Sequence, residues 1–155
     1  MHPVPAATAI LAGGAMAGIC DITYAIVYSS FRGVPASRVL QSVASGLLGA
    51  PAYDGGAFTA ALGLLLHFFI AISAAAIFYV ASKWLPFLTR QAVFAGLLYG
   101  VMIYAVMNFV VLPLSAYPAS VTLTPLLTVT GLLVHSFLVG LPIALAVRRT
   151  ARRPL

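Results

Sequence analysis

The side chains most able to do chemistry in this chain lie inside long apolar runs. They are one acid, two histidines and one amide, namely Asp21, His67, His135 and Asn108. A carboxylate and two imidazoles can pass a proton between them or hold a small polar solute, and two imidazoles can also bind the iron of a haem. An ionisable side chain is costly in an apolar environment, so we treat these positions as functional candidates.

Two phrases of nearly identical sequence contain the histidines. GLLLHFF covers 63–69 and GLLVHSF covers 131–137, so His67 and His135 lie 68 residues apart at the same point of each phrase. Each phrase follows two glycines in a G-x-x-x-G pattern, which lets membrane helices approach closely. These pairs are Gly14 with Gly18 and Gly96 with Gly100. The same pairs are candidate contacts between copies of the chain in a homo-oligomer. The repetition predicts two helical hairpins in the same orientation, a parallel repeat about the membrane normal.

Composition indicates that lipid is the main solvent of the chain. Only 6% of the residues are charged and 63% are hydrophobic, whereas a soluble domain carries about 25% charged residues. A helix needs about 20 apolar residues to cross the hydrocarbon core, and four runs are long enough, at 7–28, 57–81, 92–112 and 123–147. The runs do not alternate as β-barrel strands do. The sequence therefore predicts an all-α polytopic membrane protein, with one transmembrane domain over 1–155.

The first loop predicts a short amphipathic helix over 36–48. Its polar residues recur at helical spacing on one side, with valines and leucines on the other. The polar set is Arg38, Gln41, Ser42 and Ser45, and the apolar set is Val39, Leu40, Val43 and Leu47. We expect this helix to lie along the membrane surface with its apolar side toward lipid or the bundle. The alternative is a lid over an opening between the spans.

Counting along the predicted helices brings the polar side chains to similar depths. At the helical rise, His67 and His135 lie roughly 15 and 18 Å below the outer boundary, with Asp21 and Asn108 roughly 10 and 6 Å below it. We therefore expect both imidazoles to point into the bundle and Asp21 to approach one of them. The candidate path for a proton or a small polar solute comprises Asp21, Tyr24, His67, Tyr104, Asn108 and His135.

These residues are compatible with several functions. We favour movement of protons or a small polar solute, with an accessory or assembly subunit of a membrane complex as the alternative. A second alternative is haem bound by His67 and His135, with Arg32 or Arg38 near its propionates; otherwise no cofactor is expected. The polar groups could also serve only to hold the helices together. An enzyme is not expected, because two acids in the whole chain leave little for acid–base catalysis.

The basic residues predict the orientation in the membrane. Lys83 and Arg90 lie between the second and third spans, and four arginines follow the fourth, whereas Arg32 and Arg38 alone lie in the outer loops. Six basic residues against two put both termini in the cytoplasm. The basic tail over 148–155 is expected to contact anionic lipid rather than nucleic acid, through Arg148, Arg149, Arg152 and Arg153.

The order of these features resembles the YagU-type group of small bacterial inner-membrane proteins of unknown function. The similar features are the glycine-rich first span, GLLLHFF, NFVVLPLSAYP closing the third span, GLLVHSFLVG and the cluster RRTARR. The resemblance implies a multi-pass protein of the bacterial inner membrane, with His67 and His135 as shared positions. It implies no reaction, and the first loop departs from the group's pattern.

The predicted orientation can be checked with a topology reporter. A reporter that is active only outside the cytoplasm should stay silent when it is fused to the C-terminus, because the positive residues hold that end inside. The same reporter inserted in the first loop should be active. A strong signal from the C-terminal fusion would contradict both the orientation and the depths derived from it.

Overall fold

The computed structural model of the protein describes residues 4–119 and 124–151. Within these residues the protein is all helical, and four helices are long and apolar enough to cross a membrane. They cover Ala6–Ser30, Gly56–Trp84, Ala92–Leu114 and Pro125–Arg148. The predicted all-α fold with four candidate spans is confirmed. The predicted start of the fourth span, Leu123, lies outside the described residues.

Two of the four spans contain π-helical turns. Helices α1 (Ala6–Ser30) and α3 (Gly56–Trp84) are unbroken. The third span comprises α5 (Ala92–Val106), η2 (Met107–Val111) and α6 (Leu112–Leu114). The fourth comprises α7 (Pro125–Val134), η3 (His135–Gly140) and α8 (Leu141–Arg148). The shorter elements between spans are α2 (Ala36–Leu48), η1 (Ala50–Asp54) and α4 (Phe87–Arg90).

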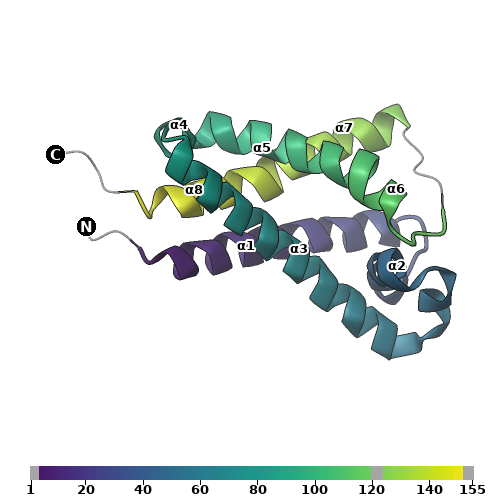
Figure 1. Ribbon diagram of the computed structural model, residues 1–155. Helices are drawn as coiled ribbons and strands as arrows, with labels where there is room; N and C mark the ends of the chain where they lie inside the picture. The colour runs from purple at the N-terminus through teal and green to yellow at the C-terminus, as the bar shows by residue number, and fades with distance from the viewer. Residues whose placement is uncertain (1–3, 120–123, 152–155) are drawn as a thin grey trace.

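The bundle has two distinct ends. The start of α1, the end of α8 and α4 lie at one end, which we call the terminal end, and α2 lies at the opposite end, which we call the α2 end (Figure 1). Helix α1 packs against both α3 and the fourth span, and the third span packs against the fourth. Sequence charge predicts that the terminal end faces the cytoplasm.

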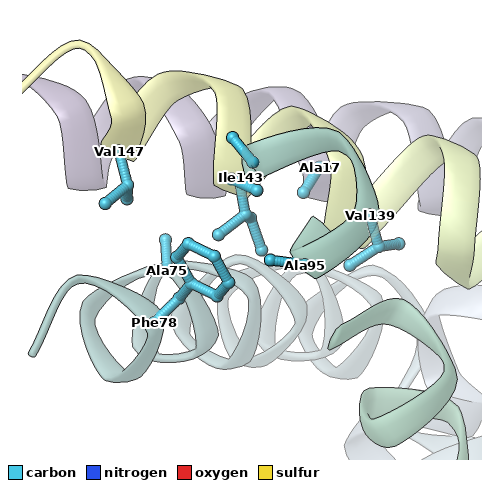
Figure 2. Packing of buried hydrophobic residues seen from close by; sticks show 9 residues of the cluster. Ala17, Ala75, Phe78, Ala95, Val139, Ile143 and Val147 are labelled. Atoms are coloured by element: carbon cyan, nitrogen blue, oxygen red, sulfur yellow. The ribbon is translucent and has the colours of Figure 1, made fainter. Parts of the chain in front are cut away.

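The apolar core closes the terminal end. Phe78 of α3 is 1% exposed, and Ile143 and Val147 of α8 are fully buried. These side chains pack with small residues from α1, α3 and α5, as Figure 2 shows for Ala17, Ala75 and Ala95. The Tyr99 ring of α5 meets Phe78 edge-on at 4.9 Å between centroids, and its hydroxyl donates to the Ala74 carbonyl at 2.7 Å. All four spans therefore meet at this end.

The glycine pairs make matching contacts in the two hairpins. A Cβ added at Gly14 would lie 2.6 Å from the Cα of Ile72, and one added at Gly96 would lie 2.9 Å from the carbonyl oxygen of Gly140. Ile72 and Gly140 are 68 residues apart, the same spacing as the two histidines. The second glycines repeat the match, with Gly18 against Phe68 and Gly100 against Ser136. This match supports the predicted parallel repeat. It also covers both pairs within the chain, so a second copy would have to dock on another face.

Helix α2 covers the predicted range and packs closely on α3. It begins after Pro35 and ends at Gly49, whose φ of 70° suits only glycine well. At Gly63 an added Cβ would overlap the carbonyl oxygen of Leu40, so the two helix backbones are in direct contact there. Gly63 opens the GLLLHFF phrase. Gly63, a glycine of the repeated phrase, therefore allows α2 to pack directly against α3.

The polar side of α2 differs from the expectation. We expected only the apolar side to face lipid or the bundle, but Gln41 on the polar side is 5% exposed and Ser45 is fully buried. The Gln41 amide donates to the Gly56 carbonyl at 3.1 Å and to the Thr59 hydroxyl at 3.4 Å. The Gly56 carbonyl and the Thr59 hydroxyl in the first turn of α3 are acceptors for this amide, and the two bonds hold part of the polar face of α2 inward.

Prolines account for the two π-helical turns. Pro142 follows η3 and Pro113 follows η2, and in each case the residue four positions earlier, Leu138 or Phe109, lies inside the π segment. A proline cannot donate to that carbonyl, and its ring crowds it. A wider turn relieves the crowding while the helix continues. Sequence analysis had not predicted either turn.

The contact at Gly63 can be tested against a matched glycine. Gly63→Ala should destabilise the protein by about 1–3 kcal/mol, because the added methyl group has to push α2 away from α3. Gly46→Ala, in α2 itself, should be neutral or slightly stabilising, because its Cβ would meet only Ser115 at 3.8 Å. Unfolding of both variants in mixed detergent micelles measures the difference. Equal stability of the two would contradict the close contact.

Candidate functional site

Three of the predicted residues line one cavity. Asp21 of α1, His67 of α3 and His135 at the start of η3 all border a space of about 190 Å³, which we call the inner cavity. It lies between the spans, with Val43 of α2 and Met107 of η2 also in its wall. The expectation that both imidazoles point into the bundle therefore agrees with their place in the structure.

His67 joins two helices. Its Nε2 lies 2.8 Å from the carbonyl oxygen of Gly18, in the G-x-x-x-G pair of α1. A carbonyl only accepts, so Nε2 carries the proton and donates it. In the neutral ring, Nδ1 is then left with a lone pair. The neighbouring Phe68 ring packs edge-on at 5.6 Å and separates the two backbones enough for the imidazole to reach across.

His135 bonds within its own helix instead. Its Nδ1 lies 2.9 Å from the carbonyl oxygen of Gly131, four residues earlier, so Nδ1 donates and Nε2 keeps the lone pair. The reason lies at Gly100, where an added Cβ would overlap the backbone of His135 and Ser136. The backbones touch there, and no space remains for a ring between them. The two histidines of the repeated phrase therefore carry their proton on different ring nitrogens, Nε2 in His67 and Nδ1 in His135.

Asp21 shares the cavity with the histidines but is not bonded to them. It is half-buried, and in residues 4–119 and 124–151 the structure records no hydrogen bond or ion pair to its carboxyl group. Both imidazole N–H groups already donate to backbone carbonyls, which explains why neither pairs with the acid. The site thus offers a carboxyl group and two ring nitrogens as acceptors.

The other three predicted residues do not line the inner cavity. The Asn108 amide donates to the Tyr104 carbonyl of its own helix at 2.9 Å. Tyr104 is 7% exposed and packs edge-on against the His135 ring at 5.4 Å. Tyr24 stacks on Tyr28 at 5.8 Å. Tyr104 supports His135, whereas Tyr24 and Asn108 take no direct part in the cavity.

A second cavity adjoins the first toward the α2 end. This outer cavity has a volume of about 350 Å³ and lies between α2, α3 and the η2–α6 segment. It shares Val43, Ile70 and Met107 with the inner cavity, and most of its remaining wall is aliphatic. Sequence reasoning missed it, because an apolar side chain carries no sign of whether it faces lipid, a neighbour or a cavity.

The rim of the outer cavity carries its few polar groups. Ser42, Ser115 and Tyr117 line it. Burial, with a smaller contribution from Tyr53, raises the pKa of Tyr117 above its usual value, so this hydroxyl stays protonated at neutral pH. Arg38 stands nearby on α2, donating to the Tyr53 carbonyl at 2.8 Å with its guanidinium 4.6 Å from that ring's centre.

The residues present do not fit a bis-histidine haem. The inner cavity holds about 190 Å³, and pockets for drug-sized ligands run from about 300 to 1,000 Å³. The Nε2 of His67 is also committed to the Gly18 carbonyl.

No protein-family model, curated protein or solved structure matches this chain. The resemblance to the YagU-type group therefore stays a prediction.

The unequal roles of the two histidines lead to a stability prediction. His67→Phe keeps a ring of similar size but removes the bond to Gly18, so the protein should lose about 1 kcal/mol of stability, the usual size of an interhelical hydrogen bond in a membrane. His135→Phe removes a bond within one helix and should cost less. Unfolding in mixed micelles compares them. Equal losses would contradict the assigned bonds.

Proposed function

We propose that the protein transports protons or a small polar solute through the inner cavity. The observation that carries this proposal is that Asp21, His67 and His135, from three different spans, border one space. Ionisable groups inside a membrane bundle usually mark such a path. Each of the three can take up and release a proton, and together they can hold a solute that donates hydrogen bonds.

The shape of the bundle supports access from one side. Toward the α2 end, the inner cavity adjoins the outer cavity. Toward the terminal end, Phe78, Ile143 and Val147 fill the space between the spans. A transporter needs states open to one side and closed to the other, and this arrangement has the features of one such state.

Two elements in the cavity wall are suited to rearrangement. The π-helical turns η2 and η3 contribute Met107, His135 and Val139 to the inner cavity. Such turns are rare within α-helices and occur often at functional sites. We infer that opening toward the terminal end involves a change at η3, where Pro142 already interrupts the bonding of the fourth span.

Proton movement is measured in proteoliposomes that contain a pH-sensitive dye. A potassium gradient with valinomycin drives protons inward, and the wild-type protein should acidify the interior faster than empty vesicles. Asp21→Asn should slow this flux by about 100-fold, the typical effect of removing a positioned proton-transfer group.

The chain contains a matched control for this experiment. Asp54 is the only other acid, and it is exposed near the α2 end. Asp54→Asn makes the same chemical change outside the cavity and should leave the flux unaltered. Equal flux in Asp21→Asn and the wild type would overturn the proton path. Absence of flux and of solute uptake from every folded sample would favour an accessory subunit.

A further inference from the structure

The two cavities adjoin each other and both have mostly apolar walls, but only the inner one is lined by acid and histidine side chains. The inner cavity presents acceptor groups, and the outer cavity presents mainly aliphatic side chains, among them Leu66, Ile70 and Leu112. They meet where Val43, Ile70 and Met107 line both. A single molecule that occupied both would need a polar head and an apolar tail.

The acceptor groups specify the kind of head. His67 and His135 each donate their one N–H to a backbone carbonyl, so their remaining ring nitrogens offer lone pairs when the rings are neutral. The Asp21 carboxyl group adds further lone pairs, and a negative charge when it is ionised. In the described part of the chain, no Lys or Arg lines either cavity. A cation with N–H donors matches this set, whereas an anion or a pure acceptor does not.

The size of the outer cavity suits the tail. Its volume of about 350 Å³ falls within the range of about 300 to 1,000 Å³ typical of small-molecule sites. The inner cavity, at about 190 Å³, is large enough only for a small group. The division of volume therefore matches a small head and a longer apolar tail.

We propose that the ligand of this protein is an amphipathic alkylammonium ion with a primary or secondary amine head. Its N–H groups donate to Asp21, His67 and His135, and its tail lies in the outer cavity beneath α2. This inference rests on the proposed function, because it names the solute class of the same site. It gives α2 a definite task, since Val43 and Gly46 of that helix line the space for the tail.

The experiment measures binding to the purified full chain in lipid nanodiscs. The probes are ethylammonium, butylammonium and octylammonium, with octanol and octyltrimethylammonium as head-group controls. Gly46→Leu fills the outer cavity, because the Cβ at this position meets only Ser115 at 3.8 Å and the rest of the side chain extends into the space. Ala36→Leu, at the exposed start of α2, is the matched control.

Comparison of variants removes the contribution of lipid. Longer tails also partition into the nanodisc, but equally for every variant. The ratio of wild-type to Gly46→Leu affinity should stay near one for ethylammonium and rise by about fourfold per buried methylene for the longer probes. Ala36→Leu should behave as the wild type.

The head group is tested separately. Asp21→Asn should weaken octylammonium binding and leave octanol binding unchanged. Octyltrimethylammonium, which lacks N–H donors, should bind more weakly than octylammonium.

The outcomes separate this inference from the proposed function. If the ratio of wild-type to Gly46→Leu affinity stays near one for all tail lengths, the alkylammonium proposal is wrong. Proton flux that depends on Asp21 would still support the transport proposal in that case. If octanol binds as well as octylammonium and ignores Asp21→Asn, the outer cavity is a lipid-chain groove and the proposal also fails. If the ratio rises with tail length but no variant or probe gives flux, the ligand assignment holds and transport is wrong.

Discussion

Close approach of helix backbones is the constraint on which the rest of the structure depends. Lipid tails are as apolar as leucine, so membrane helices gain little from apolar burial alone and associate through tight packing. In this chain such packing occurs where a Cβ is missing, as at Gly14 against α3 and at Gly100 against η3. The same contacts decide the chemistry of the site. Where a Phe68 ring separates the backbones, His67 reaches α1, and where the backbones touch, His135 folds onto its own helix.

The inserted helix α2 makes one hairpin different from the other. Its contact at Gly63 and the Gln41 bonds to the first turn of α3 fix α2 beside that span. In the described part of the second hairpin, no helix is inserted between the third and fourth spans. The outer cavity lies on the side where α2 stands between α3 and the η2–α6 segment. The two halves of the repeat therefore build one site together rather than one site each.

Much of the fold could be predicted from the sequence, because its signals are local. Apolar length located the spans, Pro35 and Gly49 bounded α2, and the glycine spacing indicated the hairpins. The remaining features depend on distant partners. Gln41 is buried because Gly56 lies within reach, although 15 residues separate them, and the histidine tautomers depend on which backbone is nearest. Pro113 and Pro142 are visible in the sequence, but the π-helical turns η2 and η3 could not be predicted from them.

Because the apolar core is packed at the terminal end, a rotation of α3 around this end would move its opposite end the most. Helix α3 has 29 residues and is therefore about 43 Å long at the helical rise. A rotation of about 5° around the packed Phe78, which lies about 33 Å from Gly56 at that rise, would carry this far end by about 3 Å. Because Gly63 and Gln41 tie α2 to that far end, α2 would travel with α3 and not stay behind as a separate cover. A small repacking around Phe78 and its neighbouring alanines at one end would therefore displace α2 at the other.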